Sequence, residues 1–149
     1  MRLCRTYCMI KLLNQILDPA SCGRDELLGQ LNAELVSGDY DRAERELIAH
    51  SLIDLLQHEP DPAICEGAYN LLENLSYDQV CQDRIVDAAV ANLAALPSAC
   101  LVHALPIIAY SRHPDKLEIL APFLAGDDRI VREVMSKILS HGNLDNLLK

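Results

Sequence analysis

The chain has 149 residues, half of them hydrophobic, with five tyrosines, one phenylalanine and no tryptophan. This length is typical of one domain and is sufficient to build a core without a metal or disulfide for support. The net charge of −9 argues against nonspecific binding to nucleic acid or to an anionic membrane, because both require basic surface.

Two helices are predicted at the N-terminal end, over residues 3–17 and 25–36. Asp18-Pro19 and Ser21-Cys22-Gly23 separate them. Residues 1–24 carry a net charge of +3 and the remainder −12, so the first helix is basic in an acidic protein. The pattern leaves open whether this helix caps the fold or makes contacts of its own.

The next two helices are predicted over residues 39–57 and 61–75. Apolar residues recur every three or four positions in both, as on one helical face. Asp39 is a candidate N-cap for the first. Asp61 is the candidate cap for the second, with Pro62 in its first turn.

Four further helices follow over residues 79–95, 98–110, 115–125 and 128–140, which brings the expected total to about eight. Gly126 ends one of them, Asp127 or Asp128 caps the last and Gly142 ends it. The connections are short, so consecutive helices are expected to form antiparallel hairpins. Residues 99–110 contain no charged residue, which predicts a central, buried helix kinked at Pro106; the alternative is the apolar floor of a binding groove.

An internal repeat appears when the helix after Asp61 is aligned with the helix after Asp128, an offset of 67 residues. With one further pair between them, the period is roughly 33 to 36 residues, as in two-helix repeats. The predicted fold is therefore all-α: a short right-handed solenoid of antiparallel helix pairs. The expected organisation is a single domain over 1–149, with an N-terminal pair at 1–36, three units at 39–141 and a tail at 143–149.

The segment Gly126-Asp127-Asp128-Arg129-Ile130-Val131-Arg132-Glu133 resembles the opening of the second helix in HEAT-like repeats, which reads Asp, apolar, Arg. The resemblance spans about residues 39–141, although Ile64-Cys65 replaces the Val-Arg pair in the first unit. It implies a protein that binds other proteins on a concave face. Small bacterial toxin-immunity proteins are similar in size, acidity and helical content.

An acidic stretch lies between Arg45 and Arg84, where no lysine or arginine occurs. In HEAT-like units the second helix lines the inner layer, which is expected to expose one face of the helix after Asp61. The residues predicted to bind a partner are Glu59, Asp61, Glu66, Tyr69, Asn70, Glu73 and Asp78. The simpler interpretation is a solvated surface that keeps the protein soluble.

No catalytic motif is present, and His50, His58, His103, His113 and His141 lack metal-ligand spacing. The six cysteines form no C-x-x-C pair, so buried free thiols in a reducing cytoplasm are expected. No cofactor and no metal are expected. A metal-binding or enzymatic role that uses Cys4 and Cys8 ranks last.

The function expected from these patterns is non-catalytic: an acidic inhibitor or immunity protein that covers a basic protein such as a nuclease toxin, with no nucleic acid or membrane as partner. The alternative is a structural adaptor within a larger assembly. Strong salt dependence favours the first and self-association the second.

Overall fold

The computed structural model describes residues 1–38 and 40–141, with the side chain of Arg2 excepted. These residues form eight α-helices and no strand, which confirms the all-helical prediction. The helices are α1 (Arg2–Leu17), α2 (Arg24–Val36), α3 (Arg42–Leu56), α4 (Pro62–Tyr77), α5 (Gln82–Asn92), α6 (Ser98–Ala109), α7 (Lys116–Leu124) and α8 (Arg129–His141). None of these helices is both long enough and apolar enough to cross a bilayer.

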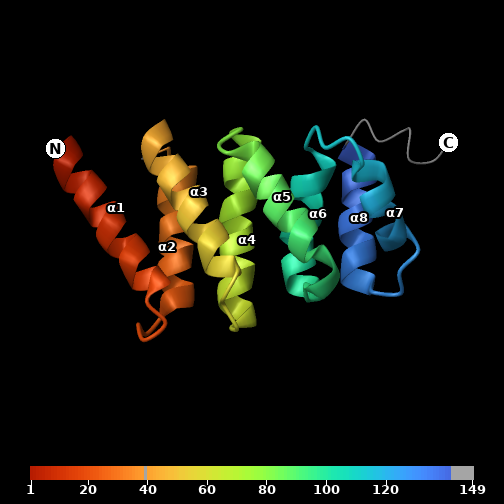
Figure 1. Ribbon diagram of the computed structural model, residues 1–149, viewed down its shortest axis with the longest axis horizontal. Helices are drawn as coiled ribbons and strands as arrows, with labels where there is room; N and C mark the ends of the chain where they lie inside the picture. Colours follow the sequence, from red (N-terminus) through yellow and green to blue (C-terminus); the bar gives the residue numbers. More distant parts are fainter. Residues whose placement is uncertain (39, 142–149) are drawn as a thin grey trace.

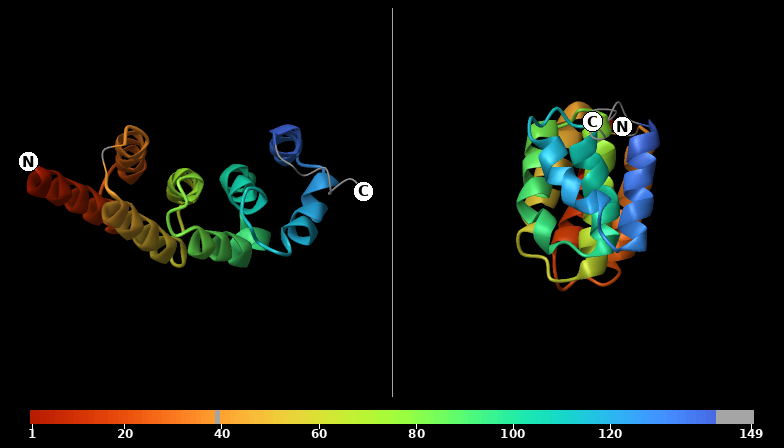
Figure 2. Two further views of the ribbon diagram at one scale, coloured as in Figure 1. Left: turned by 90° about the horizontal axis from the view of Figure 1, so that it is seen from above. Right: turned by 90° about the vertical axis from the view of Figure 1, so that its right-hand side faces the viewer.

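The helices lie in two rows (Figure 1). In the left view of Figure 2, α2, α4, α6 and α8 form one row, on the inner side of a shallow arc, and α1, α3, α5 and α7 form the other. Each inner helix contacts its neighbours in the inner row and the helix that precedes it in the chain. The hydrophobic core lies between the rows and includes Ile48, Leu71, Leu72, Ile85 and Ile108, all of which are fully buried.

Local capping explains where α4 and α8 begin. The Asp61 carboxylate accepts a hydrogen bond from the backbone N of Ala63 at 2.9 Å, and Pro62 is the first helical residue. Asp128 accepts from the backbone N of Ile130 at 2.8 Å. Each carboxylate satisfies a backbone donor that the helix itself leaves unpaired. The predicted cap at Asp61 is confirmed, and of the two candidates Asp127 and Asp128 it is Asp128 that caps α8.

The start of α3 differs from the prediction. Asp41 is the N-cap, and it forms a reciprocal capping box with Glu44. The backbone N of Glu44 donates to the Asp41 carboxylate at 3.0 Å, and the backbone N of Asp41 donates to the Glu44 carboxylate at 2.9 Å. The predicted cap, Asp39, lies outside the described residues, as do Gly142 and the tail at 143–149.

Helix α6 lies in the inner row between α4 and α8, and its contacts with both confirm the prediction that it is central and buried. A close approach of α2 to α4 depends on Gly67, where an added Cβ would lie 3.0 Å from a methyl carbon of Leu28. Gly29 on α2 has nothing within 4 Å of that position. Only the first of these glycines is therefore required by helix packing.

All six cysteines are free, as predicted, but they are not all buried. Cys4, Cys8 and Cys22 are exposed, Cys65 and Cys81 are partly buried, and only Cys100 is fully buried. The prediction of burial is wrong for the first three. Cys4 and Cys8 lie on the exposed side of α1, away from Thr6, which donates to Glu44 of α3 at 2.6 Å, and Cys22 lies in the loop that follows α1.

Candidate protein-binding site

Helix α4 occupies the middle of the inner row and contacts α2, α3, α5 and α6. Its side toward the outer row is buried, so its accessible stripe faces the concave side of the arc. This stripe contains Glu66, Asn70, Glu73 and Tyr77, which follow one another at steps of four, three and four residues. The sequence prediction that Glu66, Asn70 and Glu73 share one helical face agrees with this placement.

On this stripe, two hydrogen bonds and one ring contact connect four side chains of α4, of α6 and of the residue that follows α6. His103 Nδ1 lies 2.6 Å from Glu73 Oε2, and the Tyr77 hydroxyl donates to Glu73 Oε1 at 2.5 Å. The ring of Tyr77 meets that of Tyr110 edge-on, with 6.0 Å between the centroids and 66° between the planes. We call Glu73, Tyr77, His103 and Tyr110 the Glu73 cluster.

The Glu73 cluster combines ordered polar atoms with accessible aromatic surface. Tyr77 is 49% exposed and Tyr110 41% exposed, whereas Glu73 and His103 are largely covered. Burial raises the pKa of Tyr77 above its ordinary value, and the hydrogen bond to Glu73 and the charge of that carboxylate raise it further. The Tyr77 phenol therefore stays neutral and continues to donate to Glu73 at physiological pH.

A hollow of about 360 Å³ adjoins the two tyrosines. It is lined by Ser76, Tyr77, Gln79, Gln82, Ile107 and Tyr110. Gln79 in the turn between α4 and α5 lines this hollow, and Gln79 and Cys81 of that turn adopt left-handed backbone conformations with φ of 58° and 48°. Non-glycine residues rarely occupy this region, and such residues often mark functional turns.

Two of the residues predicted to bind a partner belong to the interior. Tyr69 is 1% exposed, so its predicted place on the exposed face is wrong. Glu59 forms a buried ion pair, in which Arg24 Nη2 lies 2.5 Å from its Oε2. Arg24 Nε also donates to the Ile16 backbone oxygen at 2.7 Å, so the pair ties α1 and α2 to the loop before α4. A carboxylate engaged in this way is not available to a partner.

Three other predicted residues remain at the surface in different settings. Asp61 is exposed while it caps α4, Asp78 is exposed and paired with Arg45, and Glu66 is exposed. The structure therefore brings Glu66, Asn70 and Glu73 together on the concave stripe. It does not bring the whole predicted set into one patch.

Sequence reasoning missed Tyr77, His103 and Tyr110. Tyr77 follows Glu73 by one helical turn, but the predicted end of the helix at residue 75 placed it outside α4, which continues to Tyr77. The pairing of α4 with α6 carries His103 and Tyr110 to this position, and no local pattern reveals that pairing. The uncharged composition of α6 was the one available signal that this helix packs in the centre.

Within residues 1–38 and 40–141, no group of three or more histidine, cysteine or acidic side chains is arranged to hold a metal ion. Comparisons with protein-family models, curated proteins and solved structures found no match to this chain.

Proposed function

We propose that the chain is a short solenoid of HEAT-like helix pairs that binds a basic protein on its concave face. In this proposal α3–α4, α5–α6 and α7–α8 are the repeated units, and α1–α2 precedes them. The packing of the inner row supports the assignment of these units, because each inner helix contacts the outer helix that precedes it in the chain and its neighbours in the inner row. The function is stoichiometric inhibition of the partner, as in an immunity protein, without catalysis.

The Glu73 cluster is the observation that carries the proposal. Two half-exposed tyrosines lie in mutual contact beside a carboxylate that is already oriented by two hydrogen bonds. Tyrosines in such settings commonly dominate binding energy, because they offer large contact area with few rotatable bonds. An arginine or lysine side chain of the partner can pack on these rings while its charge approaches Glu66 or Glu73.

The acidic stretch contributes less surface charge than its sequence suggests. Glu59 forms an ion pair with Arg24 in the interior. Asp54 and Asp83 are exposed, but they lie on α3 and α5 in the outer row. Within the acidic stretch, the concave face thus has Glu66 and the Glu73 cluster for attraction, while the outer carboxylates act at longer range on the rate of encounter.

Affinity capture with matched variants tests the proposal. The wild-type chain, Glu66→Lys, Tyr77→Ala and Asp83→Lys are used as baits in a native extract at low and at high salt, and bound proteins are identified by mass spectrometry. Asp83→Lys is the control, since it makes the same change of charge on the outer row. We expect a basic protein that is retained at low salt by the wild type and by Asp83→Lys and is lost from the other two.

The purified partner then allows the affinity to be measured. Removal of a central aromatic anchor is expected to cost about 2 kcal/mol or more, roughly a thirtyfold loss of affinity for Tyr77→Ala. A partner that binds equally well to all four baits and resists high salt would count against the concave face and favour a structural adaptor.

A further inference from the structure

A hollow of about 290 Å³ lies where the loop before α4 meets the segment between α5 and α6. Both stretches are at the lower edge of the rows in Figure 1, whereas the turn between α4 and α5 is at the upper edge. Tyr69 lines this hollow and precedes Tyr77 on α4 by about two helical turns. The hollow, which we call the Tyr69 hollow, is therefore separate from the Glu73 cluster.

The Tyr69 hollow has a buried floor and an open mouth. Tyr69 is fully buried, whereas Pro62, Ala95 and Pro97 line the same space and are exposed. Much of the remaining wall is apolar and includes Leu56. A cavity of about 150 Å³ is enough to hold benzene, so the larger volume here accommodates a benzene-sized ring with small substituents.

The Tyr69 hydroxyl is an unpaired polar group at this floor. Its oxygen is buried and has no hydrogen-bond partner within the described part of the chain. Beyond the effect of burial, a polar contact with Asn92 and the charge of Cys65 act on the pKa of Tyr69, so the hydroxyl end of the ring lies toward two side chains that line the hollow. An unpaired buried hydroxyl costs stability that phenylalanine would not, and a ligand in the hollow would give this hydroxyl a partner.

The charges around the hollow decide which class of ligand fits. Burial raises the pKa of the Cys65 thiol, and the carboxylates of Glu59 and Asp61 raise it further, so an anionic ligand would be repelled here. Glu59 is the carboxylate that lines the hollow, and its two oxygens accept hydrogen bonds from Arg24 at 3.3 Å and 2.5 Å. Because this charge is already compensated, a cationic ligand would enter apolar surroundings without a counter-ion. A neutral ligand meets neither obstacle.

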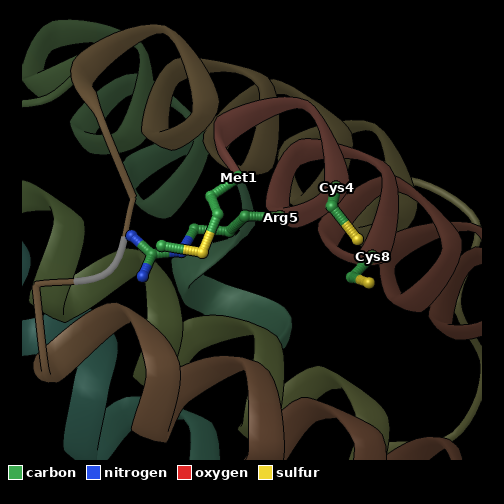
Figure 3. Close-up of a pocket in the computed structure, with 4 residues that line it drawn as sticks. All are labelled: Met1, Cys4, Arg5 and Cys8. Atoms are coloured by element: carbon green, nitrogen blue, oxygen red, sulfur yellow. The ribbon is translucent and has the colours of Figure 1, made fainter.

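A larger hollow, of about 650 Å³, lies at the start of α1 and offers less to a ligand (Figure 3). It is lined by Met1, Cys4, Arg5 and Cys8, all of which are exposed. An open side of one helix gives a ligand no floor and no buried polar atom to orient it. The Tyr69 hollow is smaller, but it gathers side chains of α3, α4 and α5 around a buried hydroxyl.

We propose that the Tyr69 hollow binds a small neutral molecule with an apolar body and one hydroxyl group. The apolar body packs on the leucine and proline side chains of the wall, and the ligand hydroxyl accepts a hydrogen bond from Tyr69. The side-chain nitrogen of Asn92 donates to the Ala88 backbone oxygen at 3.0 Å, so the side-chain oxygen of Asn92 remains as an acceptor for the ligand. A hydroxyl group can accept from one of these side chains and donate to the other, whereas an ether or a ketone can only accept. This site is independent of protein binding on the concave face.

Ligand-observed NMR titration tests the proposal with probes that share one methylphenyl group. The probes are para-cresol, toluene, para-toluate and para-methylbenzylamine, which carry a hydroxyl, no polar group, a negative charge and a positive charge. We expect para-cresol to bind the wild-type chain with a Kd on the order of 1 mM or lower. Toluene is expected to bind at least roughly fivefold more weakly, because it leaves the Tyr69 hydroxyl unpaired, and the charged probes more weakly still.

Tyr69→Phe tests the role of the hydroxyl itself. This change is expected to abolish the preference for para-cresol over toluene while toluene keeps its affinity. Tyr7→Phe, the same change at a tyrosine that is 69% exposed on α1, is the control and is expected to keep the preference. A purely structural role of Tyr69 would change the affinities for both probes together and leave their ratio unaltered.

Two neighbouring alanines test the position of the site. Ala95 is exposed and lines the hollow, so Ala95→Phe places a ring at its mouth and is expected to weaken para-cresol binding at least roughly tenfold. Ala94 is exposed but is not part of the lining, and Ala94→Phe is expected to bind as the wild type does. Equal thermal unfolding of these two variants verifies that the loss concerns the hollow and not the fold.

Three results would overturn the proposal. The first is para-cresol that binds the wild type no more tightly than toluene does, and the second is a preference for para-cresol that survives in Tyr69→Phe. The third is para-cresol binding that Ala95→Phe leaves intact, since the probe would then occupy another place. Tighter binding of para-methylbenzylamine than of para-cresol would likewise contradict a neutral ligand.

Discussion

Tyr69 offers the sharpest test of the core, because sequence and structure place it in opposite environments. The side chain is 1% exposed, and its hydroxyl is buried with no hydrogen-bond partner among the described residues. A polar contact with the Asn92 side chain lowers the pKa of Tyr69 slightly, but the two side chains do not meet in hydrogen-bond geometry, and the Asn92 amide donates to the Ala88 backbone oxygen at 3.0 Å. Tyr69→Phe removes this unpaired group and is therefore expected to raise the free energy of unfolding by about 1 kcal/mol.

The same residue makes stability depend on alkaline pH. Burial is the main reason why the pKa of Tyr69 rises from 10.0 to about 12, so the folded state holds this proton more tightly than the unfolded state. The resulting stabilisation is complete below pH 10.0 and is lost as the pH rises through about 12. A pKa shift of this size corresponds to about 3 kcal/mol in the free energy of unfolding.

Urea unfolding followed by circular dichroism measures both effects. The wild type and Tyr69→Phe are compared at neutral pH and between the two pKa values, and Tyr69→Ala, which leaves a cavity, is expected to lose about 3 to 5 kcal/mol. Equal stability of the wild type and Tyr69→Phe at every pH would show that Tyr69 is on the surface. A less stable Tyr69→Phe would show instead that the hydroxyl has a partner.

Three further predictions concern packing and thiol chemistry. Glu59→Ala is expected to destabilise the fold by about 3 to 5 kcal/mol in urea unfolding, because it leaves the Arg24 charge buried and unpaired, and a simultaneous change of both residues to apolar side chains restores much of the loss. Gly67→Ala is expected to cost about 1 to 3 kcal/mol in the same assay through overpacking, whereas Gly29→Ala gains up to about 1 kcal/mol; equal effects would contradict the close contact of α2 with α4. Burial raises the pKa of Cys100 to about 11, so mass spectrometry should find this thiol unmodified by alkylating reagents at neutral pH until the chain unfolds.

The helices were predictable because their signals are local. Asp61 and Asp128 cap the helices that follow them, and the apolar periodicity needs only neighbouring residues. The end of α5 was harder to predict from the sequence. The prediction continued this helix to residue 95, but the α-helix ends at Asn92 and a 3-10 turn, Leu93–Ala95, follows. Tight final turns of this kind are common at helix ends and leave little trace in a hydrophobic pattern.

The side-chain environments on α4 depend on its neighbours. A helix on the surface buries one stripe, and that assumption placed Tyr69 with Glu66, Asn70 and Glu73. Helix α4 instead contacts two helices of its own row and two of the other, so the buried arc is wider and includes Tyr69. The width of that arc is a property of the assembled rows, and no single-helix pattern contains it.

The role of each carboxylate in the acidic stretch was likewise decided by distant partners. Arg24 is 35 residues from Glu59, and His103 is 30 residues from Glu73. The first contact removes a charge from the surface, whereas the second orients a carboxylate beside two half-exposed tyrosines. Ordering of Glu73 and Tyr77 before a partner arrives lowers the entropy lost on binding. The fold therefore favours a small, preorganised group of side chains over a broad acidic face, and in the proposed complex it is the Glu73 cluster, more than the net charge, that should determine which basic protein is bound.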